Sequence, residues 1–121
     1  MPTVEIVVSA KVDGQYVPGF PLTKRIECDE AQTFDYEKAT GGGYAALPTG
    51  ELAEIQVLIV RPMSQQVTLR LDAQSDAGII VNAGGFAILC DVDIDAGAAT
   101  NATIDNSSSS TTSVRGVAAG T

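Results

Sequence analysis

Three aspartates at alternate positions, Asp91, Asp93 and Asp95, are the residues of this chain best suited to chemistry. On a β-strand this spacing places the three carboxylates on one face, about 7 Å apart. Carboxylates in such a row repel one another, and a hard cation such as calcium relieves the repulsion by taking their oxygens as ligands. The run does not match a calcium-binding EF-hand loop, because Ala96 replaces the glycine of its sixth position and Ala102 the glutamate of its twelfth.

The residues between these aspartates favour a strand over a metal-binding loop. Val92 and Ile94 alternate with the acids, which is the period of a strand with one wet face. We therefore expect a solvated strand face. Two alternatives stay open, a calcium site and a row of acids that faces a basic partner.

Catalysis is not expected. The chain has no histidine, the side chain most often used for proton transfer near neutral pH, so neither a Ser-His-Asp nor a Cys-His arrangement can form. Asp72 and Asp76 flank a turn, where aspartate commonly binds local backbone groups. Paired carboxylates could serve a glycosidase, but the chain has no tryptophan and only three tyrosines and three phenylalanines to line a sugar subsite. We expect no cofactor.

The two cysteines, Cys28 and Cys90, lie in line with apolar neighbours in apparent strands. Buried free thiols behave as small hydrophobic side chains, which is the role we expect for both. A disulfide between them is the alternative. A zinc site is not expected, because two cysteines without histidine cannot supply four ligands.

The composition describes one acidic globular domain. The 121 residues are 45% hydrophobic, and the net charge is −8. Binding to nucleic acid or to an anionic membrane requires a basic surface, so neither is expected. Docking onto a basic protein surface remains compatible with this charge. The first ten residues lack the features of a signal peptide, and the apolar run 57–60 is too short to cross a bilayer; we expect synthesis in a cytoplasm.

Alternation at period two extends over most of the chain and predicts about eight strands with no helix. The fold expected for residues 1–121 is all-β, a single-domain antiparallel β-sandwich or jelly roll. Val4, Ile6 and Val8 should share one face of a first strand, and Asp13-Gly14 should form a type I′ turn. Residues 54–62 are apolar on both faces, which predicts a central strand.

Two further segments carry specific expectations. Residues 86–95 predict a strand whose inward face consists of Phe86, Ile88, Cys90, Val92 and Ile94. Residues 99–121 are small and polar, with Ile104 and Val114 as their main apolar anchors, and we expect this segment to become ordered on contact with a partner. The candidate partner-contact residues are Pro18, Phe20, Pro21, Gly42, Tyr44, Val114 and Arg115.

Three stretches together resemble the small virion proteins of tailed bacteriophages, in particular capsid decoration (cement) proteins. They are Gly42-Gly43-Tyr44 with Leu47-Pro48, the run LRLDAQSDAGIIVNAGGFAILCDVDID, and the closing TNATIDNSSSSTTSVRGVAAGT. The resemblance implies a jelly-roll or sandwich protein on the surface of a capsid. Its partner would be an HK97-like shell of major capsid protein, and it would associate with itself as a dimer or trimer.

A cement protein needs no active site, because it stabilises the assembled shell by binding that state preferentially. The function expected is therefore that of a non-enzymatic structural protein of the virion. Two alternatives stay open: a structural protein of the phage tail or baseplate, and a calcium-dependent carbohydrate-binding module that uses Asp91, Asp93 and Asp95.

Overall fold

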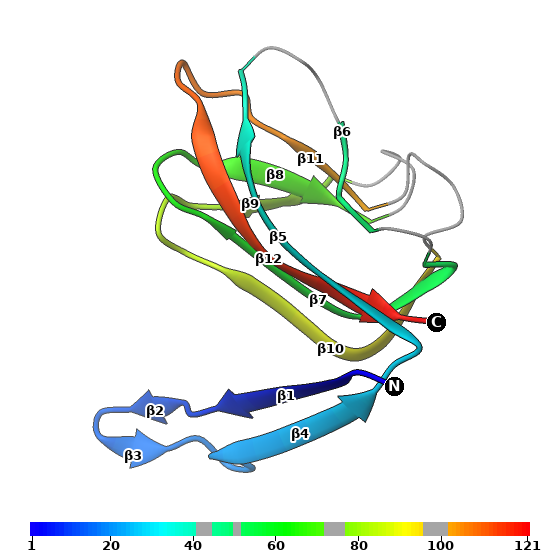
Figure 1. The fold of residues 1–121 in the computed structure, drawn as a ribbon. Helices are drawn as coiled ribbons and strands as arrows, with labels where there is room; N and C mark the ends of the chain where they lie inside the picture. The colour runs from blue at the N-terminus through cyan, green and yellow to red at the C-terminus, as the bar shows by residue number, and fades with distance from the viewer. Residues whose placement is uncertain (41–44, 50–51, 72–76, 96–101) are drawn as a thin grey trace.

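The protein is all-β, as the alternation predicted, and its strands form two packed sheets and a separate hairpin (Figure 1). The computed structural model describes residues 1–40, 45–49, 52–71, 77–95 and 102–121. Within them every strand pair is antiparallel. The described strands are β1 (Thr3–Val8), β2 (Lys11–Val12), β3 (Gln15–Tyr16), β4 (Leu22–Glu27), β5 (Glu30–Lys38), β6 (Ala45–Ala46), β7 (Glu54–Pro62), β8 (Val67–Arg70), β9 (Ile79–Val81), β10 (Ala87–Asp95), β11 (Thr103–Asp105) and β12 (Thr112–Gly120).

The strands β5 to β12 form a β-sandwich. The large sheet has the order β10-β7-β12-β5, and the small sheet has the order β6-β11-β8-β9. Between them lies the main core, whose most fully buried side chains include Ile55, Leu58, Val60, Leu69 and Ile104. β7 pairs with a strand on each side, which confirms the prediction that residues 54–62 are a central strand.

Most connections in the sandwich pass from one sheet to the other. Of the seven steps from β5 to β12, only β8 to β9 joins neighbours within a sheet. If β5 is counted as the first of eight strands, the large sheet has the order 6-3-8-1 and the small sheet the order 2-7-4-5. Neighbouring strands are therefore mostly far apart in sequence, and local hairpins contribute little to the sandwich.

The first strands form a long arm, the N-terminal hairpin (residues 3–27), beneath the outer face of the large sheet (Figure 1). Its tip turns at Asp13 and Gly14, whose φ angles of 51° and 79° confirm the predicted type I′ turn. Residues 17–21, which include Pro18 and a cis Phe20–Pro21 bond, form a loop, since proline cannot donate to a strand ladder.

The hairpin is attached to the large sheet at the end near the two termini. Here Ile6 and Cys28 pack against Val57 and Ala119 in a second, smaller apolar cluster. Backbone hydrogen bonds fix the same end: the N–H of Cys28 donates to the carbonyl of Pro2, and that of Asp29 to the carbonyl of Gly120, both at 2.9 Å. β7 and β12 therefore carry apolar side chains on both faces, one toward the sandwich core and one toward the hairpin.

The prediction that residues 86–95 present one continuous apolar face is wrong. The pairing of β10 with β7 shifts register between Cys90 and Ile94, and Asp91 adopts a left-handed φ of 60°. This bulge exchanges the two faces of the strand. Cys90 belongs to the cluster under the hairpin, whereas Val92 and Ile94 pack in the sandwich core.

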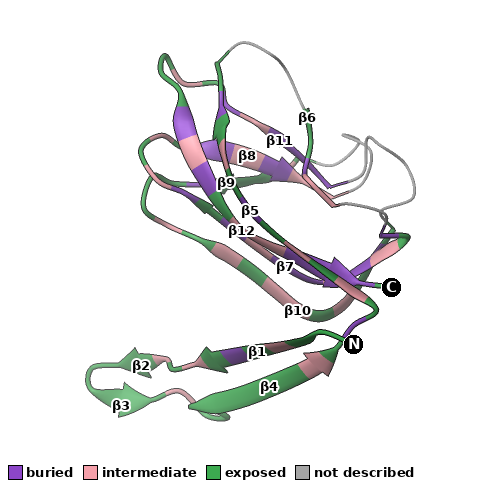
Figure 2. Cartoon of the chain, viewed as in Figure 1, coloured by how far each residue is buried: buried purple, intermediate pink, exposed green. Residues whose placement is uncertain are grey.

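The C-terminal segment also differs from the expectation of a polar tail ordered by a partner. β12 lies between β7 and β5 and pairs with both along its length. Val114 is fully buried, as are Ala118 and Ala119, and Figure 2 shows this strand largely in the colour of buried residues. The predicted anchors Ile104 and Val114 are both core residues, and Ser107 to Ser110 lie between β11 and β12.

Candidate functional site

Asp91, Asp93 and Asp95 are all exposed on β10, whereas Val92 and Ile94 between them pack in the sandwich core. Asp91 turns toward the N-terminal hairpin, where its Oδ2 lies 3.0 Å from the Nζ of Lys24. The hydrogen bond and charge of Asp91 raise the pKa of Lys24. This ion pair also explains why Lys24 interrupts the apolar alternation of β4, because its side chain reaches from the hairpin to β10. The exposed row of aspartates fits the expectation of a solvated strand face.

Asp93 and Asp95 lie beside Glu54, the residue paired with Asp95 at the start of β7. A hydrogen bond with Asp93 and the charges of Asp93 and Asp95 raise the pKa of the Glu54 carboxyl. Protonation relieves the repulsion among these acids. Within the described part of the chain, no three His, Cys, Asp or Glu side chains are grouped so as to hold a metal ion.

The most distinctive surface feature is a groove between the N-terminal hairpin and β10, which we call the wedge groove. The hairpin meets the large sheet at the end near the termini and diverges from it toward the tip (Figure 1). The resulting space has a volume of about 520 Å³. It is lined by Ile6, Val8, Phe20, Leu22 and Lys24 from the hairpin side and by Phe86, Ile88, Cys90 and Asp91 from the β10 side.

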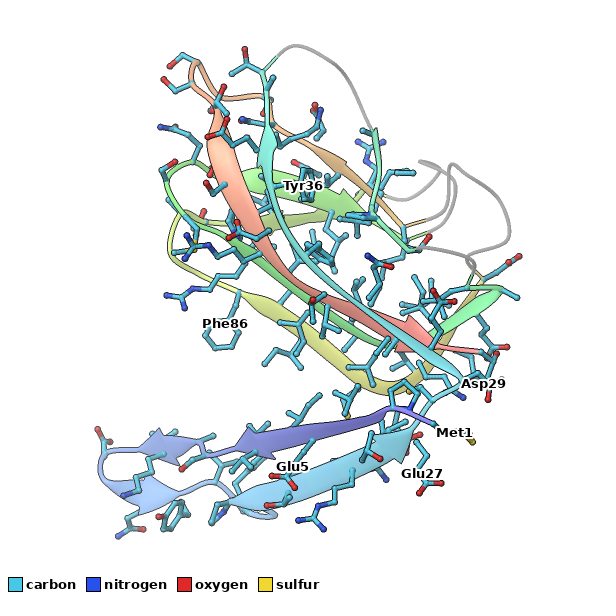
Figure 3. All side chains as sticks on the ribbon, viewed as in Figure 1. Met1, Glu5, Glu27, Asp29, Tyr36 and Phe86 are labelled. Atoms are coloured by element: carbon cyan, nitrogen blue, oxygen red, sulfur yellow. The ribbon has the colours of Figure 1, made fainter. Side chains whose placement is uncertain are left out.

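Apolar side chains on both walls of the wedge groove remain in contact with solvent. Phe86 is 65% exposed, and Leu22 and Ile88 are each 37% exposed. Figure 3 shows the Phe86 ring projecting from the large sheet on the side of the hairpin. Apolar area gathered in one concave place, with a single ion pair beside it, is typical of a binding surface rather than of a scattered surface side chain.

The two cysteines are free thiols, and both belong to the smaller apolar cluster between the hairpin and the large sheet. Cys28 is buried, and its burial raises the pKa of the thiol. Cys90 is partly exposed and lines the wedge groove. Two cysteines in one apolar cluster fit the expectation of small hydrophobic side chains.

The structure brings together only part of the predicted partner-contact set. Phe20 lines the wedge groove, and Pro18 and Pro21 lie on the exposed loop that carries it. Val114 is buried in the core and is not available to a partner, whereas Arg115 is exposed and forms an ion pair with Asp35. Gly42, Tyr44, Asp72 and Asp76 lie outside the described residues.

Charge is distributed unevenly between the hairpin and the rest of the chain. Residues 3–27 carry three basic and three acidic side chains, whereas the remainder carries four basic and twelve acidic ones. The whole net charge of −8 therefore belongs to the sandwich portion, and the hairpin is neutral. An acidic partner would therefore meet less electrostatic repulsion at the hairpin than at the sandwich.

Sequence reasoning missed the second wall of the wedge groove, since it placed Phe86 and Ile88 on a buried strand face. A signal for the groove was present in two segments. Residues 3–8 alternate in the manner of an amphipathic strand, and residues 54–62 are apolar on both faces, so the large sheet needs cover on its outer side. Only the bulge at Asp91 shows which part of β10 belongs to that side.

Comparison of the chain with protein-family models, with curated proteins and with solved structures gives no match. The described residues include no helix with the length and apolar character needed to span a membrane.

Proposed function

We propose that the protein is a non-enzymatic structural protein of a phage virion, a capsid decoration protein that binds the assembled shell of major capsid protein and stabilises it. The wedge groove is the observation on which this proposal rests. It offers a coat subunit an apolar, concave surface on the neutral part of an otherwise acidic molecule. The virion surface is the location that follows from this function.

The strand order supports the same proposal. We infer that β5 to β12 constitute a jelly roll, since eight antiparallel strands alternate between two sheets in the orders 6-3-8-1 and 2-7-4-5. Jelly rolls recur among viral structural proteins and lectins. The resemblance of the three sequence stretches to phage decoration proteins favours the first of these two classes.

Binding to purified, expanded phage shells that lack decoration tests the proposal. The protein should bind these shells saturably. It should also raise the temperature at which they disassemble, because it binds assembled coat protein and not the free subunits. The truncation Phe86→Ser should weaken binding by about tenfold or more, since an aromatic side chain at the centre of an interface commonly dominates its affinity.

A matched control is available on the small sheet. Ile80 is 61% exposed, close to the exposure of Phe86, but lies on β9 and away from the wedge groove. Ile80→Ser should leave shell binding unchanged. Equal losses in both variants, or a folded wild-type protein that does not bind shells, would contradict the proposal; binding to tail tubes instead would support a structural role in the tail.

A further inference from the structure

The strands at the edges of the sheets differ in their protection against pairing with another chain. An unpaired edge exposes backbone N–H and C=O groups, and natural proteins protect such edges with charges, bulges or very short strands. Among the described residues, β10 and β5 form the edges of the large sheet, and β6 and β9 those of the small sheet. In the hairpin, β1 pairs only with β4, and β2 only with β3.

Most of these edges carry such a protection. β10 has the bulge at Asp91 and three aspartates. β5 carries four charged residues among nine, and β4 carries Lys24, Arg25 and Glu27 among six. β2, β3 and β6 are two residues long and β9 is three, which is too short for extended pairing.

β1 has the least protection of these edges. It spans six residues with no proline, and its pairing with β4 runs over all six without a bulge. Its only charge is Glu5, which is already in an ion pair with Arg25 of β4. Four of its residues are β-branched and apolar, and one of them, Val7, is 66% exposed on the side away from the sandwich.

We propose that β1 pairs antiparallel with β1 of a second copy, about a twofold axis at Ile6, so that two hairpins form one four-stranded sheet. In this register Ile6 faces Ile6, Val4 faces Val8, and Glu5 faces Val7. Each pair joins two even-numbered or two odd-numbered positions. The side chains that share a face in one hairpin therefore share the same face of the four-stranded sheet. A twofold operation makes the contact self-complementary and closed.

Charge selects this register and this edge. An axis at Glu5 would set the two Glu5 carboxylates opposite each other, and an axis at Val7 would leave fewer pairs within β1. Pairing through β4 would oppose Lys24 to Lys24 or Arg25 to Arg25, and like charges directly opposite are destabilising. The hairpin has no net charge, so the contact brings no like net charges together. The proposal does not depend on the function proposed above.

Introducing a negative or a positive charge at Val7 tests the pairing. Val7 faces Thr23 within its own hairpin and Glu5 of the other copy in the proposed dimer. Val7→Glu should weaken dimerisation by about tenfold or more, because it creates two pairs of opposed carboxylates. Val7→Lys should retain or strengthen the dimer. Val12→Glu, the same change at an equally exposed residue of the hairpin tip, should leave it unchanged.

Sedimentation velocity over a series of protein concentrations measures these equilibria, and amide hydrogen exchange locates the contact. Backbone amides of residues 3–8 in the wild-type protein should gain protection as the concentration rises. The proposal would be overturned by a protein that stays monomeric at every concentration, or by a dimer without added protection in β1. Equal changes in the dimer dissociation constant for Val7→Glu and Val7→Lys would also overturn it.

Discussion

The hydroxyl group of Tyr36 is a buried polar atom in the sandwich. It has no partner among the described residues, and burial raises the pKa of the phenol to about 12. The ring itself is well placed, since it packs against the sandwich core and makes an edge contact with Phe34, with ring centroids 6.0 Å apart. The side chain therefore stabilises the core through its ring alone.

Tyr36→Phe should increase the free energy of unfolding by about 1 kcal/mol, because it removes an unsatisfied polar atom and leaves the ring in place. Denaturant unfolding measures the change. Tyr16→Phe is the control, since Tyr16 is 53% exposed and its hydroxyl is free to reach water; it should have almost no effect. A loss of stability in Tyr36→Phe would show that the hydroxyl has a partner.

Glu54 makes folding stability depend on pH. Its pKa is raised, so the folded protein holds this proton more tightly than the unfolded chain does. The contribution to stability is full below the ordinary carboxyl pKa of 4.5 and is lost as the pH rises through the raised value. Glu54→Gln mimics the protonated form, so its gain in melting temperature should be larger at pH 7 than at pH 4.

Glu37→Gln is the matched control for Glu54, because it removes the same charge from an exposed position on β5. Thermal melting of both variants at the two pH values separates the local repulsion from the effect of net charge. A gain for Glu54→Gln no larger than that for Glu37→Gln would contradict the assigned role of Asp93 and Asp95.

At the scale of the elements, β12 requires a glycine at its centre. A Cβ at Gly116 would overlap the carbonyl oxygen of Ile59 on β7 and lie 2.9 Å from the ring of Phe34 on β5. Both neighbours are held in the large sheet, so neither can move without disturbing the pairing on its side of β12. Glycine here permits close approach of three strands.

Gly116→Ala should therefore reduce the free energy of unfolding by about 2 kcal/mol, the usual size of an overpacking effect. Chemical denaturation measures the loss. Arg115→Ala, at the next residue of the same strand, removes only an exposed ion pair with Asp35 and should change stability by less than about 1 kcal/mol. Similar values for the two variants would show that the sheet can accommodate the extra methyl group.

The bulge in β10 exchanges the faces of its odd-numbered and even-numbered residues. Before Asp91, Leu89 packs against the sandwich core and Cys90 joins the cluster on the hairpin side; after it, Val92 and Ile94 pack in the core. Alternation at period two cannot show such an exchange, because a single inserted residue reverses every later side chain. The residue type of Asp91 was the one indication of a bulge, since aspartate tolerates a left-handed φ better than most residues.

At the scale of the whole molecule, the sequence predicts what depends on near neighbours. The type I′ turn at Asp13-Gly14, the central strand 54–62 and the core residues Val67 and Leu69 were all predictable, because turn chemistry and burial pattern are local. The position of β12 was not. A small, polar composition is typical of an exposed tail, yet small residues are also what a strand needs when close neighbours lie on both sides.

The wedge groove was unpredictable for a related reason. Its two walls come from residues near positions 6–24 and 86–91, and no periodic pattern connects segments so far apart. Phe20 could be proposed as a contact because it lies in a proline-rich loop. Phe86 could not, because an aromatic residue at the start of an alternating segment is normally a core residue.

The central place of β12 has a consequence for folding. β5 and β7 pair with β12 and not with each other, so the large sheet cannot close before residues 112–120 join strands that lie at least fifty residues away in sequence. Contacts between such distant segments form slowly, because the loop between them must close first. Deletion of residues 112–120 should leave β5 and β7 with unpaired edges and yield insoluble product.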